Sequence, residues 1–117
     1  MTLRNRILSF IQFRGAKIPD AIEDPSELEW PEGWESLHYD DIPKFTRELN
    51  REICKAHILY GVPACALGRR KDRDDFIYQI QTEKAKFATV HLTWRKEKKP
   101  SWPYTEVYET FHECFEE

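Results

Sequence analysis

The alternation of hydrophobic and polar residues predicts one helix in the middle of the chain. Apolar residues recur there at helical spacing: Ile42, Phe45, Leu49, Ile53 and Ala56. Such a stripe is typical of an amphipathic helix that buries one side, and we expect this helix to cover residues 41–57. Asp40 or Asp41 can cap its N-terminus, and Gly61 follows its end as a stop signal.

The chain changes to strand-like patterns after this helix. We expect strands over residues 62–69, 76–81 and 87–94, because apolar side chains alternate along the second and third of them. The polar connections between them have hairpin lengths, and a fourth short strand fits residues 104–108. An antiparallel meander is therefore the expected sheet.

The two ends of the chain predict shorter elements. Apolar residues at helical spacing favour a helix over residues 2–13, whereas residues 15–39 hold several prolines and should form an irregular acidic segment. Near the C-terminus, Thr110 and Glu113 form a capping-box pattern before a last short helix.

Together these elements predict an α+β fold in a single domain, residues 1–117. The expected architecture is a three- to four-stranded antiparallel meander, with the central amphipathic helix and the short terminal helices packed on one face. Residues 1–39 would hold the N-terminal helix and the irregular acidic segment, and residues 40–117 the α+β core.

Composition supports a packed domain and narrows its class. The chain has 117 residues, of which 40% are hydrophobic and 14% aromatic, which is enough for one core. The three cysteines are widely spaced and odd in number, so we expect reduced thiols and a cytoplasmic location. No apolar run approaches the roughly 20 residues of a membrane span, so no membrane association is expected.

Charge is segregated along the chain, although the net charge is only −3. Residues 20–41 hold nine acidic residues and no Lys or Arg. This segment either packs against basic segments of the same chain or recruits a protein partner with a basic surface. The overall acidity makes nucleic-acid binding unlikely, and only the basic run 95–99 offers a local site for weak binding.

These features favour a non-enzymatic protein-interaction or regulatory module, with an inhibitor or immunity protein as one form of it. The candidate contact surface combines tryptophans with neighbouring acids: Trp30, Trp34, Glu32, Glu35 and Trp102. Aromatic side chains of this kind dominate many protein interfaces. The competing interpretation is that the tryptophans pack against the core. The sequence specifies no oligomeric state.

A second hypothesis is a small enzyme, or a metal or ligand binder. It would use a cluster of carboxylates with one imidazole: Asp72, Asp74, Asp75 and His91. Such groups can bind a divalent ion or transfer protons. The simpler interpretation is a polar turn in which the acids pair with the nearby arginines. No nucleophile motif or phosphate-binding loop is present, so no catalytic residue, metal or cofactor is assigned.

Three runs of residues carry a resemblance to a known group of proteins. They are His57 to Gly61, Arg69 to Asp75 and Val90 to Trp94, followed by the Trp102-Pro103 segment. The chain resembles a family of small bacterial α+β proteins without an assigned activity, over about residues 40–117. The resemblance implies a bacterial origin and an α+β fold, and it brings no site residues.

Overall fold

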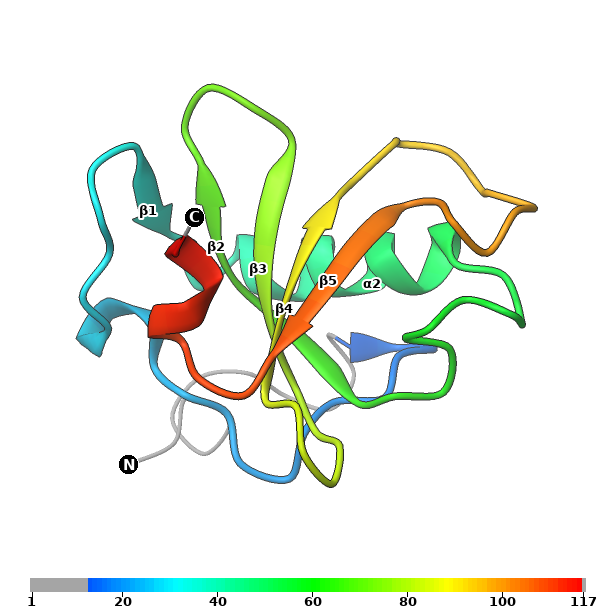
Figure 1. Ribbon diagram of the computed structural model, residues 1–117, viewed down its shortest axis with the longest axis horizontal. Helices are drawn as coiled ribbons and strands as arrows, with labels where there is room; N and C mark the ends of the chain where they lie inside the picture. The colour runs from blue at the N-terminus through cyan, green and yellow to red at the C-terminus, as the bar shows by residue number, and fades with distance from the viewer. Residues whose placement is uncertain (1–12, 117) are drawn as a thin grey trace.

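The computed structural model describes residues 13–116. It is an α+β domain built on one five-stranded antiparallel sheet whose strands follow one another in chain order (Figure 1). The strands are β1 (Trp34–Ser36), β2 (Ala64–Arg70), β3 (Asp75–Ile80), β4 (Phe87–His91) and β5 (Tyr104–Tyr108). The helical elements are α2 (Asp41–Glu52) and the short 3-10 turns η2 (Pro25–Glu27) and η3 (His112–Phe115). The predicted fold class and the meander are confirmed.

One face of the sheet packs against α2, and we call it the helix face. Phe45 of α2 lies 4.6 Å from the ring of Phe76 on β3, and the Tyr78 hydroxyl donates a hydrogen bond of 2.8 Å to the Phe45 carbonyl. The ladder shifts register between Ala66 and Gly68. Next to this irregularity, the amide of Ala66 donates to the hydroxyl of Thr46. These two buried polar groups of the sheet are thus bonded to α2.

The helix is one turn shorter than predicted. Ile53 already has extended backbone angles, and residues 54–62 form successive turns instead of the predicted helix end. In these turns His57 is buried, and its Nε2 lies 2.9 Å from the Pro103 carbonyl before β5. That tertiary hydrogen bond outweighs the helical propensity of residues 53–57. Asp40 occupies the N-cap position without a side-chain capping bond.

The sheet has five strands, so the expectation of three or four was too low. The missing strand is β1, which lies inside the segment expected to be irregular. Its pairing with β2 places Trp34 opposite Arg70 and Ser36 opposite Gly68. A strand of three residues gives almost no periodic pattern, and its stability comes from the long-range partner. The third strand also ends earlier than expected, at His91 rather than Trp94.

The packing of the C-terminal helix on the same face as α2 was also predicted wrongly. Figure 1 shows η3 in front of the sheet and α2 behind it. Phe111, beside η3, contacts Phe87, whose side of β4 is opposite to that of the buried Ala88 and Val90. The C-terminal turn therefore covers part of the second face, which we call the open face. The predicted helix over residues 2–13 falls outside the described residues except for Phe13.

Trp30 fixes the acidic segment to the open face. A Cβ atom on Gly68 would overlap the indole ring of Trp30, so only glycine allows this approach. The indole NH donates 2.8 Å to the Pro25 carbonyl, and Phe111 packs edge-on against the ring at 5.0 Å. Trp30 is therefore a packing residue that joins the segment before β1 to β2 and to the C-terminus.

No helix within residues 13–116 combines the length and the apolar character needed to cross a membrane.

Candidate functional site

A hollow of about 460 Å³ occupies the uncovered part of the open face, and we call it the sheet hollow. Strand register assembles its floor. Asp75, His91 and Tyr104 are direct neighbours on β3, β4 and β5, and Thr89 lies beside Glu106 in the next row. Because successive residues of a strand alternate between faces, these side chains all point to the same side of the sheet.

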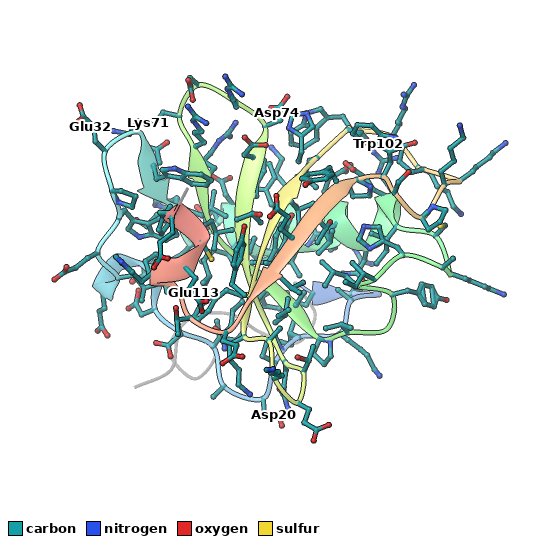
Figure 2. All side chains as sticks on the ribbon, viewed as in Figure 1. Asp20, Glu32, Lys71, Asp74, Trp102 and Glu113 are labelled. Atoms are coloured by element: carbon teal, nitrogen blue, oxygen red, sulfur yellow. The ribbon has the colours of Figure 1, made fainter. Side chains whose placement is uncertain are left out.

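Aromatic side chains surround this floor. Trp34 of β1, Trp102 of the loop before β5, and Tyr104 and Tyr108 of β5 all line the hollow. Trp34 is held in place because its ring packs edge-on against Phe115 of η3 at 5.3 Å. In Figure 2 Trp102 lies on the β5 side of the molecule, whereas Glu32 and Lys71 lie on the β1 side. The hollow is thus bounded by η3 on one side and by the 92–103 loop on the other.

The predicted Asp and His residues are only partly brought together. The Nδ1 atom of His91 lies 2.7 Å from Oδ1 of Asp75, and both line the sheet hollow. Asp72 instead forms an ion pair of 2.9 Å with Arg70 in the turn between β2 and β3. Asp74 lines a separate shallow hollow beside His91. The unit available for chemistry is therefore one Asp–His pair.

Glu106 is the second carboxylate of the sheet hollow. The hydroxyls of Tyr104 and Tyr108 donate hydrogen bonds of 2.9 and 3.1 Å to its two oxygens. The hydrogen bond to Glu106 raises the pKa of Tyr104, and burial together with the same carboxylate raises the pKa of Tyr108. Both tyrosines therefore stay neutral donors at physiological pH.

The thiol at the edge of the hollow is not a nucleophile at neutral pH. Burial raises the pKa of Cys114 to about 12, so almost none of it is thiolate. The buried Cys65 behaves in the same way, with a pKa raised by burial to about 12. Nucleophilic chemistry at the hollow would therefore need a group other than these two thiols.

The predicted contact surface is divided between different parts of the molecule. Trp34 and Trp102 line the sheet hollow, whereas Glu32 lines an adjoining hollow of about 470 Å³ next to Trp34. Glu35 is exposed and lies opposite Arg69 in the β1–β2 register, and the Arg69 guanidinium lies 5.0 Å from the ring of Phe76 on the helix face. Trp30 packs against β2 and the C-terminal segment, as described above.

The basic run 95–99 forms an exposed loop at the other side of Trp102. Arg95 and Glu97 pair within the loop at 3.2 Å. Lys96, Lys98 and Lys99 are exposed and form no ion pair within residues 13–116. Trp102 and this loop together line a shallow hollow of about 350 Å³.

Sequence reasoning missed Glu106, Tyr104 and Tyr108. A signal was present, because these three residues alternate along one predicted strand and must share a face. It could not be interpreted without knowing which face the terminal helix covers. Among the described residues, no group of three or more His, Cys, Asp or Glu side chains is arranged to hold a metal ion.

Comparisons of the chain with models of protein families, with curated proteins and with solved structures found no match. The family resemblance based on the sequence patterns thus stays a prediction, and any function must be argued from the geometry of this chain.

Proposed function

We propose that the protein is a non-enzymatic protein-interaction module that binds its partner through the β5 side of the sheet. One observation carries this proposal. Large hydrophobic side chains that are exposed in residues 13–116 gather in two segments, 58–60 and 94–107: Ile58, Tyr60, Trp94, Trp102, Tyr104 and Val107. Trp102 and Tyr104 lie on the open face, whereas Val107 lies on the opposite side of β5 and Trp94 packs against Phe45 and Phe76 of the helix face. The six residues thus surround the β5 side of the sheet on both faces, and we call them the β5 surface.

The two segments are also close together in space. His57 contacts both the Pro103 carbonyl and the Thr105 hydroxyl, so the 54–62 turns are attached to the start of β5. Exposed apolar side chains scattered singly are normal, but a cluster of this kind is typical of an interaction site. Ile58 and Tyr104 are 61% and 55% exposed.

The position of β5 in the sheet is a second feature that favours a partner on this side. β5 is last in the strand order, so one of its edges has no strand beside it in the described part of the chain. Such an edge can pair with a strand of another protein, and its flanking side chains then provide specificity. A regulatory module of the inhibitor or immunity type would use a surface of this kind.

Site-specific photo-crosslinking tests the proposal. A benzoylphenylalanine at position 104 should give a discrete crosslinked species in cells, whereas the same group at position 84 should not. Lys84 is a suitable control because it is exposed and lies in the turn between β3 and β4, at the opposite ends of the strands from the 92–103 loop. Equal crosslinking from both positions, or none from position 104, would contradict a β5-side interface.

The Asp75–His91 pair supports a second candidate, a small-ligand or acid–base site. Asp75 orients the imidazole through Nδ1, which leaves Nε2 as the atom that could exchange a proton with a ligand. Ligand-observed NMR with a fragment library tests it. Hits lost in His91→Gln but kept in the control His38→Gln would support this candidate, and hits that both variants retain would refute it.

A further inference from the structure

We propose that the sheet hollow binds a cationic side chain of the partner, an arginine or lysine whose charged group lies against Glu106. This inference rests on the proposed function and names the chemistry that the partner would present. The hollow shares Trp102 and Tyr104 with the β5 surface, so one partner can contact both.

The walls of the hollow suit a cation. Four aromatic side chains line it, and the faces of Trp and Tyr rings attract ammonium and guanidinium groups. Three of the four rings are anchored, the exception being the exposed Trp102. Trp34 packs on Phe115, and the two tyrosine hydroxyls are both tied to Glu106. A hollow of about 460 Å³ is within the usual size of a small-ligand pocket, so it can hold one long side chain.

Glu106 is the carboxylate that remains available for such a cation. Its hydrogen bonds come from hydroxyl groups, which are neutral, and it forms no ion pair within residues 13–116. Asp75 differs, because His91 already contacts it at 2.7 Å. The two tyrosine donors orient Glu106 without neutralising it, which leaves a fixed negative charge between aromatic rings.

Arg73 also lines the hollow, and it allows a test in which a substitution should strengthen the binding of a cation. It is exposed, and it forms no ion pair in the described part of the chain. An arginine at the rim opposes the entry of a second cation because like charges repel. Removing its charge should therefore strengthen the binding of a cationic side chain, whereas a site for an anion would be weakened by the same change.

The experiment compares two capped amino acids by 1H–15N NMR titration of the full chain. N-acetylarginine amide is the probe, and N-acetylcitrulline amide is its neutral isostere. We expect the arginine compound to shift the indole NH of Trp34 and Trp102 and the amides of β5. Its affinity should be about five- to tenfold higher than that of the citrulline compound, as expected for cation–π and exposed ion-pair interactions together.

Three variants sharpen the result. Glu106→Gln should abolish the preference for arginine over citrulline, and Arg73→Gln should increase the affinity for arginine. Glu109→Gln is the matched control, because Glu109 is exposed, pairs with Lys84 and does not line the hollow. This variant should keep the wild-type preference. If Glu106→Gln fails to fold, the wild-type comparison and Arg73→Gln still decide.

Equal affinities for the two compounds, or shifts confined to residues outside the hollow, would overturn the inference. Weaker arginine binding in Arg73→Gln would also overturn it. Failure of the proposed function is distinguishable from these outcomes. If a partner crosslinks from position 104 but arginine is not preferred over citrulline, the proposed function stands and the proposed cation site is wrong. If arginine is preferred but no partner crosslinks, the cation site stands and the proposed function is wrong.

Discussion

Glu52 should make the stability of this protein fall as the pH rises towards neutrality. It lies at the last turn of α2 and is completely buried. Its carboxylate accepts hydrogen bonds from the backbone amides of Thr93 and Trp94, each at 2.8 Å, and from the Thr93 hydroxyl at 3.0 Å. It thus fixes the turn after β4, in which Trp94 takes a left-handed φ of 63° that costs roughly 1 kcal/mol.

Burial has the largest effect on the pKa of this carboxyl group. Burial, together with a hydrogen bond to Glu48, raises the pKa of Glu52 from 4.5 to about 7, although the bonds from Thr93 and Trp94 act in the opposite direction. Below pH 4.5 the group is protonated in both the folded and the unfolded chain. Between pH 4.5 and about 7 the unfolded chain loses its proton first, so the free energy of unfolding decreases. One pKa unit corresponds to about 1.4 kcal/mol, so the loss reaches about 3 kcal/mol.

Glu52→Gln removes this titration and keeps an oxygen acceptor. The variant loses one of the two acceptor oxygens and should be less stable than the wild type by about 1 kcal/mol at pH 4.5. Because the wild type loses stability as the pH rises and the variant does not, the two curves should cross below pH 7. At pH 8 the variant should be the more stable protein by about 2 kcal/mol.

Urea unfolding followed by tryptophan fluorescence from pH 4.5 to 8.5 measures the difference. Burial lowers the pKa of His57, which reduces stability as the pH falls, but both chains contain His57 and the effect cancels in the comparison. Glu83→Gln, an exposed carboxylate in the turn before β4, is the control and should follow the wild-type curve. A difference between wild type and Glu52→Gln that stays constant over this range would refute the reasoning.

Two further substitutions test the packing of the sheet. Gly68→Ala should destabilise the protein by about 1–3 kcal/mol, because the new methyl group overlaps the Trp30 ring; an unchanged thermal midpoint would mean that Trp30 does not lie on β2. Tyr78→Phe should cost about 1 kcal/mol in urea unfolding, because the Phe45 carbonyl loses a buried donor. A gain in stability in this variant would show that the hydroxyl is not satisfied there.

The parts of the fold that could be predicted are those with a local pattern. The apolar stripe of α2 and the hairpins β2–β3 and β3–β4 have such patterns, and they were located within a few residues. The capping box was also predicted, since Thr110 and Glu113 exchange both of its hydrogen bonds. Each of these features depends on residues that are close together in the sequence.

The parts that were predicted wrongly depend on partners far along the chain. β1 exists because β2 is beside it, and α2 ends early because His57 contacts residue 103. The same reason explains the site. Asp75 and His91 were suggested by residue type, but Glu106 joins them through the pairing of β4 with β5. A sequence pattern gives the face of each strand and not the face that a terminal turn will cover.

The acidic segment illustrates how tertiary contacts change the meaning of a charge pattern. Its start is tied to β3, because Gln79 bonds the Glu23 amide at 2.8 Å and the Ala21 carbonyl at 2.7 Å. Its later part forms β1. These contacts lay the segment along the open face, where it covers one side and leaves the sheet hollow on the other. Of this segment only Trp34 lines the sheet hollow, so the carboxylate that we propose for a basic partner is Glu106 of the C-terminal strand and not one of the dense run of acids before α2.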